Sequence, residues 1–246
     1  MRSSRGTHAM RNTAHLMLTS VFALLISGSG ADSHPQAKNS QAALDQVLTR
    51  MESVGKNFRS FAADFTQRKY IALLKEFESM ESGRFLYARA KDGTALLRRE
   101  CKVPAEKILT IKGGVAVLYQ PSLNEATKIN LGANKDKAEY LALGLGQSPA
   151  KLRETFDIEY LGEEAVDGVP CSILQLKPKS HDVSSFYSAI TIWVSKSDGL
   201  PVQQKLQEPG GDYTLNKFSA AKLNPSIAES EFEQKLPKDV VIQVIK

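Results

Sequence analysis

The sequence is poor in the residues from which most catalytic and metal sites are built. It contains two cysteines, one tryptophan and four histidines among 246 residues. Two cysteines are too few for a disulfide scaffold or a four-cysteine zinc site. The sequence also lacks a phosphate-binding loop, a Gly-x-Ser-x-Gly nucleophile motif and a His-Glu-x-x-His zinc motif. These gaps predict a protein that is not an enzyme and that uses no metal and no cofactor.

The first 31 residues have the three-part pattern of a secretory signal peptide. Three arginines form a basic start, an apolar run extends from Leu16 to Ile26, and small residues lead to Ala31. The apolar run is shorter than the roughly 20 residues of a membrane span. We therefore expect export and cleavage near Ala31, and an uncleaved N-terminal anchor is the alternative.

Loss of this segment removes three arginines and lowers the formal net charge from +5 to +2. The remaining charge is not concentrated, so nucleic acid is not an expected partner. The doublet Arg98-Arg99 is expected to be solvated charge on a strand. After export, Cys101 and Cys171 would lie in an oxidising compartment, where they could pair or remain two buried thiols.

One helix is expected at the start of the mature chain. Apolar residues recur at three- and four-residue steps from Leu44 to Phe58, which predicts an amphipathic helix capped by Asn39 or Ser40. The polar residues 32–39 before it are expected to form an unstructured leader.

The hydrophobic period then changes to two, which predicts consecutive antiparallel hairpins over residues 58–131. Asp92-Gly93 and Gly113-Gly114 supply tight turns between them. Residues 135–156 break the rhythm and predict two short helices, Lys137–Leu143 and Pro149–Phe156, before strands resume.

The sequence thus predicts an α+β fold in which residues 32–246 form a single domain. One large antiparallel sheet, curved or partly closed, would carry helices on one side. Its apolar face could be filled by its own side chains or could leave room for a ligand. The expected ligand contacts are Phe61, Phe65, Phe85, Tyr87, Leu109, Ile111, Val117, Tyr119, Ile190 and Ile192.

The order of several short motifs is typical of a known family. Phe61-Ala-Ala-Asp-Phe-Thr-Gln67 follows the helix, and the hairpin Ile111-Lys-Gly-Gly-Val-Ala-Val-Leu-Tyr-Gln-Pro121 comes later. Asp198-Gly-Leu-Pro-Val202 and Leu223-Asn-Pro225 then follow. Over essentially the whole mature chain, this order resembles the LolA-like family of periplasmic outer-membrane lipoprotein carriers.

The resemblance implies an unclosed antiparallel β-barrel with lid helices over an apolar cavity. It implies a periplasmic carrier that shields the acyl chains of lipoproteins, or of lipids, between the inner and outer membranes. The implied partners are an inner-membrane ATP-driven lipoprotein release complex and an outer-membrane acceptor, and the carrier itself would be a monomer. The alternatives are a periplasmic lipid- or lipoprotein-sensing module that regulates a partner protein, and a secreted hydrolase.

The resemblance also implies a lid switch. By position, Arg89 is similar to the family arginine on the second strand, which reaches toward the lid. Without ligand, Arg89 would hydrogen-bond carbonyls of residues 135–156 and hold the lid shut. The expected lid side chains are Leu141, Leu143, Leu145, Leu152 and Phe156.

Overall fold

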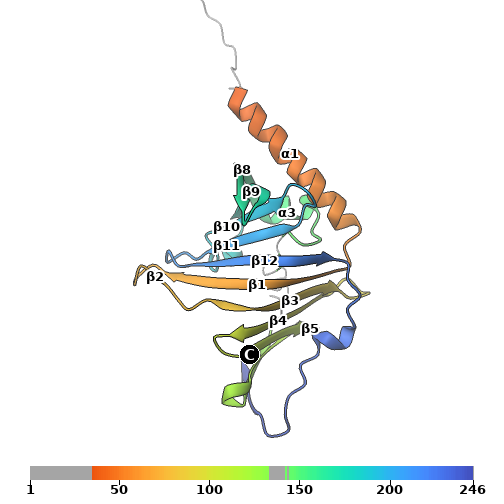
Figure 1. Cartoon of the computed structure of the whole chain (residues 1–246), viewed down its shortest axis with the longest axis vertical. Coiled ribbons are helices and arrows are strands. Elements are labelled where there is room, and N and C mark those ends of the chain that lie inside the picture. Colours follow the sequence, from red (N-terminus) through yellow and green to blue (C-terminus); the bar gives the residue numbers. More distant parts are fainter. Residues whose placement is uncertain (1–34, 133–141, 143, 246) are drawn as a thin grey trace, which may run out of the picture. The chain divides into compact units, whose positions relative to one another are not determined.

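The computed structural model describes residues 35–132, 142 and 144–245, which belong to one compact unit. Helix α1 (Pro35–Lys56) precedes one large sheet (Figure 1). The strands are β1 (Ser60–Ile71), β2 (Glu76–Phe77), β3 (Glu81–Arg89), β4 (Ala95–Val103), β5 (Lys107–Lys112), β6 (Val115–Gln120), β7 (Glu125–Asn130), β8 (Phe156–Val166), β9 (Val169–Pro178), β10 (Ala189–Ser195), β11 (Pro201–Gln207), β12 (Tyr213–Leu223) and β13 (Val241–Ile245). The short helices are η1 (Pro121–Leu123), α3 (Pro149–Thr155), α4 (His181–Ser184) and η3 (Glu229–Phe232).

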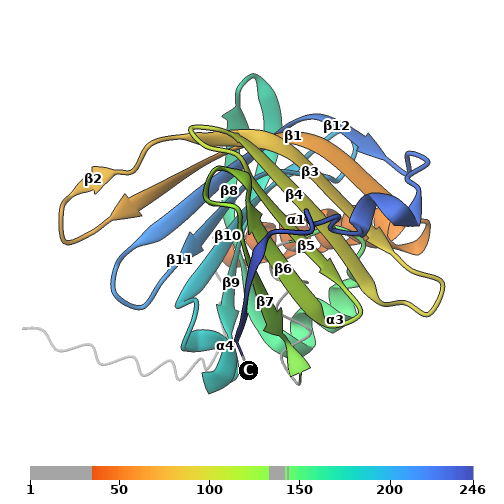
Figure 2. The same ribbon diagram turned by 90° about the horizontal axis from the view of Figure 1, so that it is seen from below.

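The strands form an open sheet in the order β13-β7-β6-β5-β4-β3-β1-β12-β11-β10-β9-β8, with β2 paired to β1 outside this path. Neighbours along the path are antiparallel except for β13 and β7, which are parallel. The sheet is strongly curved (Figure 2), which confirms the predicted unclosed antiparallel architecture. Pairing of β1 with β12 joins the first long strand to the last one in the middle of the sheet.

Tight turns create this meander of neighbouring strands. Gly113 and Gly114 connect β5 to β6, and both have positive φ angles, 59° and 75°. A two-residue turn with two positive φ angles matches the right-handed twist of the flanking strands. The predicted hairpin at this position is confirmed by the pairing of Lys112 with Val115.

Helix α1 begins earlier than the sequence suggested. Residues 35–40 are already helical, so the expected cap at Asn39 or Ser40 and the expected unstructured leader over residues 35–39 are both wrong. Proline is tolerated in the first turn of a helix, because the backbone N–H that it lacks would have no intrahelical partner there. Pro35 is therefore compatible with the longer helix.

The second predicted lid helix is confirmed in position. In α3, the Ser148 hydroxyl accepts a hydrogen bond from the Lys151 backbone N–H at 3.2 Å, and Pro149 follows the cap. This is the N-terminal chemistry that favours a helix start. Apart from Ala142, the helix expected at Lys137–Leu143 lies outside the described residues.

The core divides into clusters on the two faces of the sheet. The first concave cluster comprises Phe58, Phe61, Ala63, Phe65, Phe85, Tyr87, Leu97, Cys101, Ile111, Ala116, Ala142, Leu145, Leu200 and Phe218. The second concave cluster comprises Leu44, Val47, Leu48, Met51, Leu152, Phe156, Leu174, Leu176, Val183, Ile190, Ile192, Val194 and Leu206. The convex cluster comprises Leu86, Ala88, Leu96 and Phe232. Both faces of the central strands are thus covered, one by α1, α3 and nearby loops and the other by η3.

Candidate functional site: the concave face of the sheet

Aromatic rings form the floor of the first concave cluster. Phe61 comes from β1, Phe85 from β3 and Phe218 from β12, and all three are buried. The rings of Phe61 and Phe218 lie edge to face with centroids 5.9 Å apart, and those of Phe85 and Phe218 are 5.4 Å apart. Such contacts add to the stabilisation that comes from burial alone. The result is a continuous apolar floor across three neighbouring strands.

Most of the predicted ligand contacts meet at this floor. The residues from β1, β3 and β5 that lie in or against the first concave cluster are Phe61, Phe65, Phe85, Tyr87, Leu109 and Ile111. Ile190 and Ile192 lie on the same face but in the second concave cluster, which α1 covers. The sheet therefore brings eight of the ten predicted contacts onto one face, in two separate groups.

Val117 and Tyr119 are the exceptions, and their predicted place on the concave face is wrong. The regular antiparallel register pairs Ile111 with Ala116, and both belong to the first concave cluster. Side chains alternate between the two faces of a strand, so Val117 and Tyr119 point to the convex face. The β6 side chains that share a face with Ile111 are Ala116 and Leu118.

A short loop covers part of the first concave cluster. This covering segment consists of Ala142 and Gly144–Gln147, and the side chains of Ala142 and Leu145 are fully buried. Within it, the Leu145 N–H donates to the Ala142 carbonyl at 2.9 Å. The Gly144 N–H donates to the Gln147 side-chain oxygen at 3.1 Å. The hydrogen bonds of the covering segment are thus partly internal, which lets it lie on an apolar floor.

The predicted lid residues lie in different places. Leu145 belongs to the covering segment, whereas Leu152 and Phe156 pack beneath α1 in the second concave cluster. Leu141 and Leu143 lie outside the described residues. Arg89 stands at the end of β3, on the same side as Phe85 and Tyr87, and its guanidinium donates to the Gly93 carbonyl at 3.4 Å.

A polar network borders the other end of the aromatic floor. Glu81 accepts hydrogen bonds from Arg99 at 2.7 Å and from Lys107 at 2.9 Å, and Arg99 also donates to Gln67 at 3.0 Å. The Arg99 guanidinium lies over the Phe65 ring at 4.4 Å. Charge-assisted hydrogen bonds of this kind are among the stronger polar contacts in proteins.

The network determines the charge state of its carboxylate. Burial raises the pKa of Glu81, but the hydrogen bonds from Arg99 and Lys107 outweigh it and hold that pKa below its ordinary value. The sequence pattern did not predict this arrangement, because a doublet such as Arg98-Arg99 is typical of solvated charge on a strand. The alternation of side chains along β4 could have indicated it, because neighbouring residues of a strand point to opposite faces. Arg99 points to the concave face, and Arg98 points toward η3.

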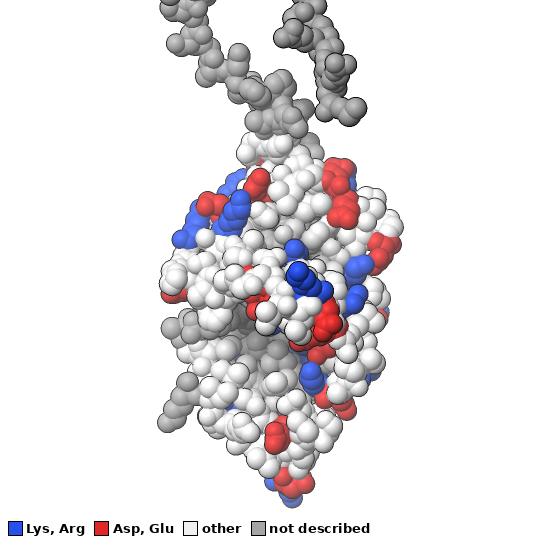
Figure 3. All heavy atoms as spheres, turned by 90° about the vertical axis from the view of Figure 1, so that its left-hand side faces the viewer, with Lys and Arg blue, Asp and Glu red and all other residues white. Residues whose placement is uncertain are grey.

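The open space beside this network is small. A cavity of about 30 Å³ lies between Phe65, Phe85, Phe218 and the polar side chains of Gln67, Arg99 and Asn216. A cavity of this size holds one or two waters at most. One side of the molecule is hollowed; the surface on one flank of the hollow is largely uncharged, and charged side chains gather on the other flank (Figure 3).

Metal-binding groups of side chains and membrane-spanning helices are both absent from the described part of the chain. Among residues 35–132, 142 and 144–245, no group of three His, Cys, Asp or Glu side chains is arranged to hold a metal ion. Within the same residues, no helix is both long and apolar enough to cross a membrane.

Cys101 and Cys171 are free, buried thiols on β4 and β9. Of the two alternatives, a disulfide bond or two buried thiols, the structure shows the second.

An open, curved antiparallel sheet with a helix across its apolar concave face defines a class of proteins, the unclosed β-barrels of the lipoprotein-carrier superfamily. A family model described as that of an uncharacterized protein matches residues 84–226, more than half of the chain. An outer-membrane lipoprotein carrier protein from Azotobacter vinelandii is 26% identical over 223 residues, covering 91% of this chain and 94% of that protein. The chain belongs to the LolA-like family.

The solved structure of MucB agrees on the fold. The crystal structure of MucB superposes with a TM-score of 0.50 at 16% identity, over 81% of this chain and 66% of MucB, just under two thirds of that protein. A LolA superfamily protein from Nitrosomonas europaea matches with a TM-score of 0.36 at 13% identity, over 79% of this chain and 97% of its own.

Proposed function

We propose that the protein is a periplasmic carrier that shields the acyl chains of lipoproteins, or of lipids, and moves them from the inner to the outer membrane. The observation that carries this proposal is the apolar concave floor, part of which is covered by a short loop rather than by a helix or strand. The similarity to the Azotobacter vinelandii carrier over nearly the full length of both chains supports the same function.

Acyl chains can compete with the covering segment for the floor. Burial of a sixteen-carbon chain is favourable by on the order of 13 kcal/mol, at about 0.8 kcal/mol per methylene. Exposure of the Leu145 side chain costs about 2 kcal/mol, and Ala142 adds less. The difference favours exchange of the covering segment for cargo, so the protein without cargo stays closed and still opens when an acyl chain is offered.

Release of the cargo to its acceptor must then be favourable in free energy. The sequence has no nucleotide-binding motif, so the energy for loading would come from an inner-membrane, ATP-driven release complex. An outer-membrane acceptor with a more favourable acyl site would take the cargo, and the carrier would act as a monomer between the two. In this role the protein binds and shields, and it performs no chemical reaction.

Arg89 is the proposed switch between the closed and open states. It stands at the end of β3, on the concave side, and in the proposed closed state it would donate to carbonyls of residues 135–156. A hydrogen bond that exists only without cargo would stabilise the closed state and so weaken cargo binding, which favours hand-over. Residues 1–31 would act as the signal peptide and residues 32–246 as the single carrier domain.

The test begins with the full chain, expressed with its N-terminal segment and purified gently from the periplasm. Native mass spectrometry, followed by organic extraction, should reveal a stoichiometric lipoprotein or lipid adduct. After extraction, the empty protein should take up a fluorescent fatty acid. A clean mass together with no fatty-acid uptake would show that the concave face is filled by its own side chains, and the carrier proposal would fail.

A lipid-sensing regulator is the second candidate, because the fold of MucB is similar and MucB has been crystallised in complex with MucA. Adduct formation alone does not separate the two functions. A transfer assay does: a carrier moves labelled cargo from donor to acceptor vesicles in proportion to its concentration, whereas a sensor binds the cargo without moving it.

A further inference from the structure

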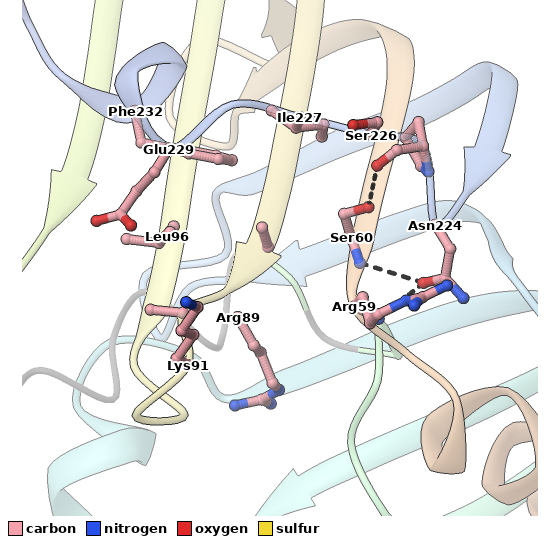
Figure 4. A pocket seen from close by; sticks show the side chains of 13 residues that line it. Arg59, Ser60, Arg89, Lys91, Leu96, Asn224, Ser226, Ile227, Glu229 and Phe232 are labelled. Atoms are coloured by element: carbon pink, nitrogen blue, oxygen red, sulfur yellow. Dashed lines mark hydrogen bonds between the residues drawn. The ribbon is translucent and has the colours of Figure 1, made fainter.

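A second cavity lies on the convex side, away from the aromatic floor. Its volume is about 440 Å³, and it lies between the start of β1, the end of β3 and the strap that connects β12 to η3 (Figure 4). We define the strap as residues 224–228. Cavities of this size are in the range that binds small molecules, whereas protein partners usually bind larger and flatter surfaces.

The wall formed by the strap is fixed by hydrogen bonds. The Ser60 hydroxyl donates to the Pro225 carbonyl at 2.6 Å. The Asn224 side-chain oxygen accepts from the backbone N–H groups of Arg59 and Ser60, at 2.7 and 3.2 Å, and its amide donates to the Asn57 carbonyl at 2.8 Å. The cavity is therefore preformed and needs no ligand to assemble it.

The floor of this cavity is apolar. Ala88 and Leu96 belong to the convex cluster, where they pack with Phe232 of η3, and Ile227 packs against the same cluster. Hydrogen bonds from Arg98 to the carbonyls of Glu231 and Glu233 hold η3 in place. The floor is therefore suited to contact the carbon atoms of a ligand rather than a charged group.

The rim is cationic. Arg59, Arg89 and Lys91 line the cavity, and the one acid that lines it, Glu229, pairs with Lys112 at 3.0 Å. Arg59 stands on one side and Lys91 on the other (Figure 4). Within the described residues, neither the Arg59 guanidinium nor the Lys91 ammonium forms an ion pair.

We propose that this cavity binds a phosphate ester with a short carbon backbone, the chemistry of the glycerol phosphate part of a glycerophospholipid. A guanidinium matches the geometry of phosphate oxygens, and a lysine opposite it adds a second positive charge. The apolar floor accommodates the glycerol carbons. Apart from Arg89, which lines the edge of the cavity and is the proposed switch, the site shares no residue with the first concave cluster, and the proposal does not depend on the carrier function.

The test uses the full chain, expressed with its N-terminal segment, and four probes: inorganic phosphate, sn-glycerol 3-phosphate, phosphatidylglycerol vesicles and phosphatidylcholine vesicles. Calorimetry measures the soluble probes, and co-sedimentation measures the vesicles. The variant Arg59→Gln/Lys91→Gln is compared with Lys102→Gln/Lys238→Gln, which removes the same charge from exposed positions outside the cavity. Fluorescent fatty-acid uptake is measured in parallel and should be the same for both variants.

We expect the cavity variant to lose at least tenfold in affinity for a phosphate probe, while the control variant keeps it. Binding of glycerol phosphate in solution would identify a soluble phosphate ester as the ligand, and binding to phosphatidylglycerol vesicles alone would identify a lipid headgroup. Equal losses in both variants, or no binding of any phosphate probe, would overturn the proposal.

Discussion

Gly146 lies against Phe58 so closely that a Cβ at position 146 would overlap the phenylalanine ring. Gly146 also has a φ angle of +68°, which side chains other than glycine rarely adopt. Phe58 lies in the short connection between α1 and β1, two residues after the end of the helix, and belongs to the first concave cluster. The contact therefore locks the covering segment to the end of the helix.

Gly146→Ala should loosen the covering segment. Overlap with the ring and the strained backbone together destabilise the closed state by about 1–3 kcal/mol. We expect faster uptake of a fluorescent fatty acid than in the wild type, followed by stopped-flow fluorescence. Gly210→Ala is the control, because nothing lies within 4 Å of a Cβ there. If both variants load at the wild-type rate, the covering segment does not limit access to the floor.

The two faces of the β5–β6 hairpin should respond differently to a polar side chain. Ile111→Ser removes apolar contact from the concave floor, and about 1.4 kcal/mol of lost burial corresponds to tenfold weaker fatty-acid binding. Val117→Ser, on the convex face, should bind like the wild type. Equilibrium titration with a fluorescent fatty acid measures both, and circular dichroism confirms that both fold. Equal weakening would place the acyl site elsewhere.

Arg89→Leu should take up acyl cargo and pass it on poorly. Without the proposed hydrogen bond, the closed state loses stability, so the cargo-bound state is favoured. The measurement is transfer of labelled cargo to acceptor vesicles after loading. Arg84→Leu is the matched control, because Arg84 is on the same strand with its side chain on the opposite face. Transfer by Arg89→Leu at the wild-type rate would refute the switch.

Glu81 should make the protein less stable in acid. The pKa of Glu81 is lowered in the folded protein, so its contribution to stability is present above the unfolded-state pKa, near 4.5. That contribution is lost as the pH falls through the lower folded-state pKa. Glu81→Gln should unfold about 1–2 kcal/mol more easily at pH 7 and show a flatter pH dependence below pH 4.5.

Urea denaturation between pH 3 and pH 7 measures both effects. Glu106→Gln replaces an exposed carboxylate on the neighbouring loop and should leave the curve close to that of the wild type. A pH profile of Glu81→Gln that is parallel to the wild-type profile would show that the network does not determine the acid response.

Cys101 and Cys171 should be unreactive thiols in the native protein. Burial raises the pKa of each, and only the thiolate reacts with a disulfide reagent. We expect no rapid reaction with Ellman's reagent in buffer and two equivalents in denaturant. A denatured chain with no free thiol would show that the exported protein is oxidised.

Much of the sheet could be predicted because its strands are joined by local turns. Gly113-Gly114 and Asp92-Gly93 fix hairpins between neighbours in sequence. The face of the sheet that each side chain of β6 occupies could not be predicted in the same way. Its larger residues, Val117 and Tyr119, face the convex side, where η3 arrives from far along the chain to cover the neighbouring strands. The position of Arg99 could not be predicted for a similar reason, since its hydrogen-bond partners Gln67 and Glu81 come from other strands.

The cover on the second concave cluster is far more firmly attached than the covering segment. Helix α1 buries Leu44, Val47, Leu48 and Met51 there, which stabilises its position by roughly 8 kcal/mol at about 2 kcal/mol each. That is comparable to the whole stability of a typical domain, about 5–15 kcal/mol. Helix α1 therefore stays in place as long as the protein is folded. In the proposed carrier, only the half of the barrel built from β1, β3 to β6 and β12 would be vacated, and this half would set the upper limit on the cross-section of cargo that one molecule can hold.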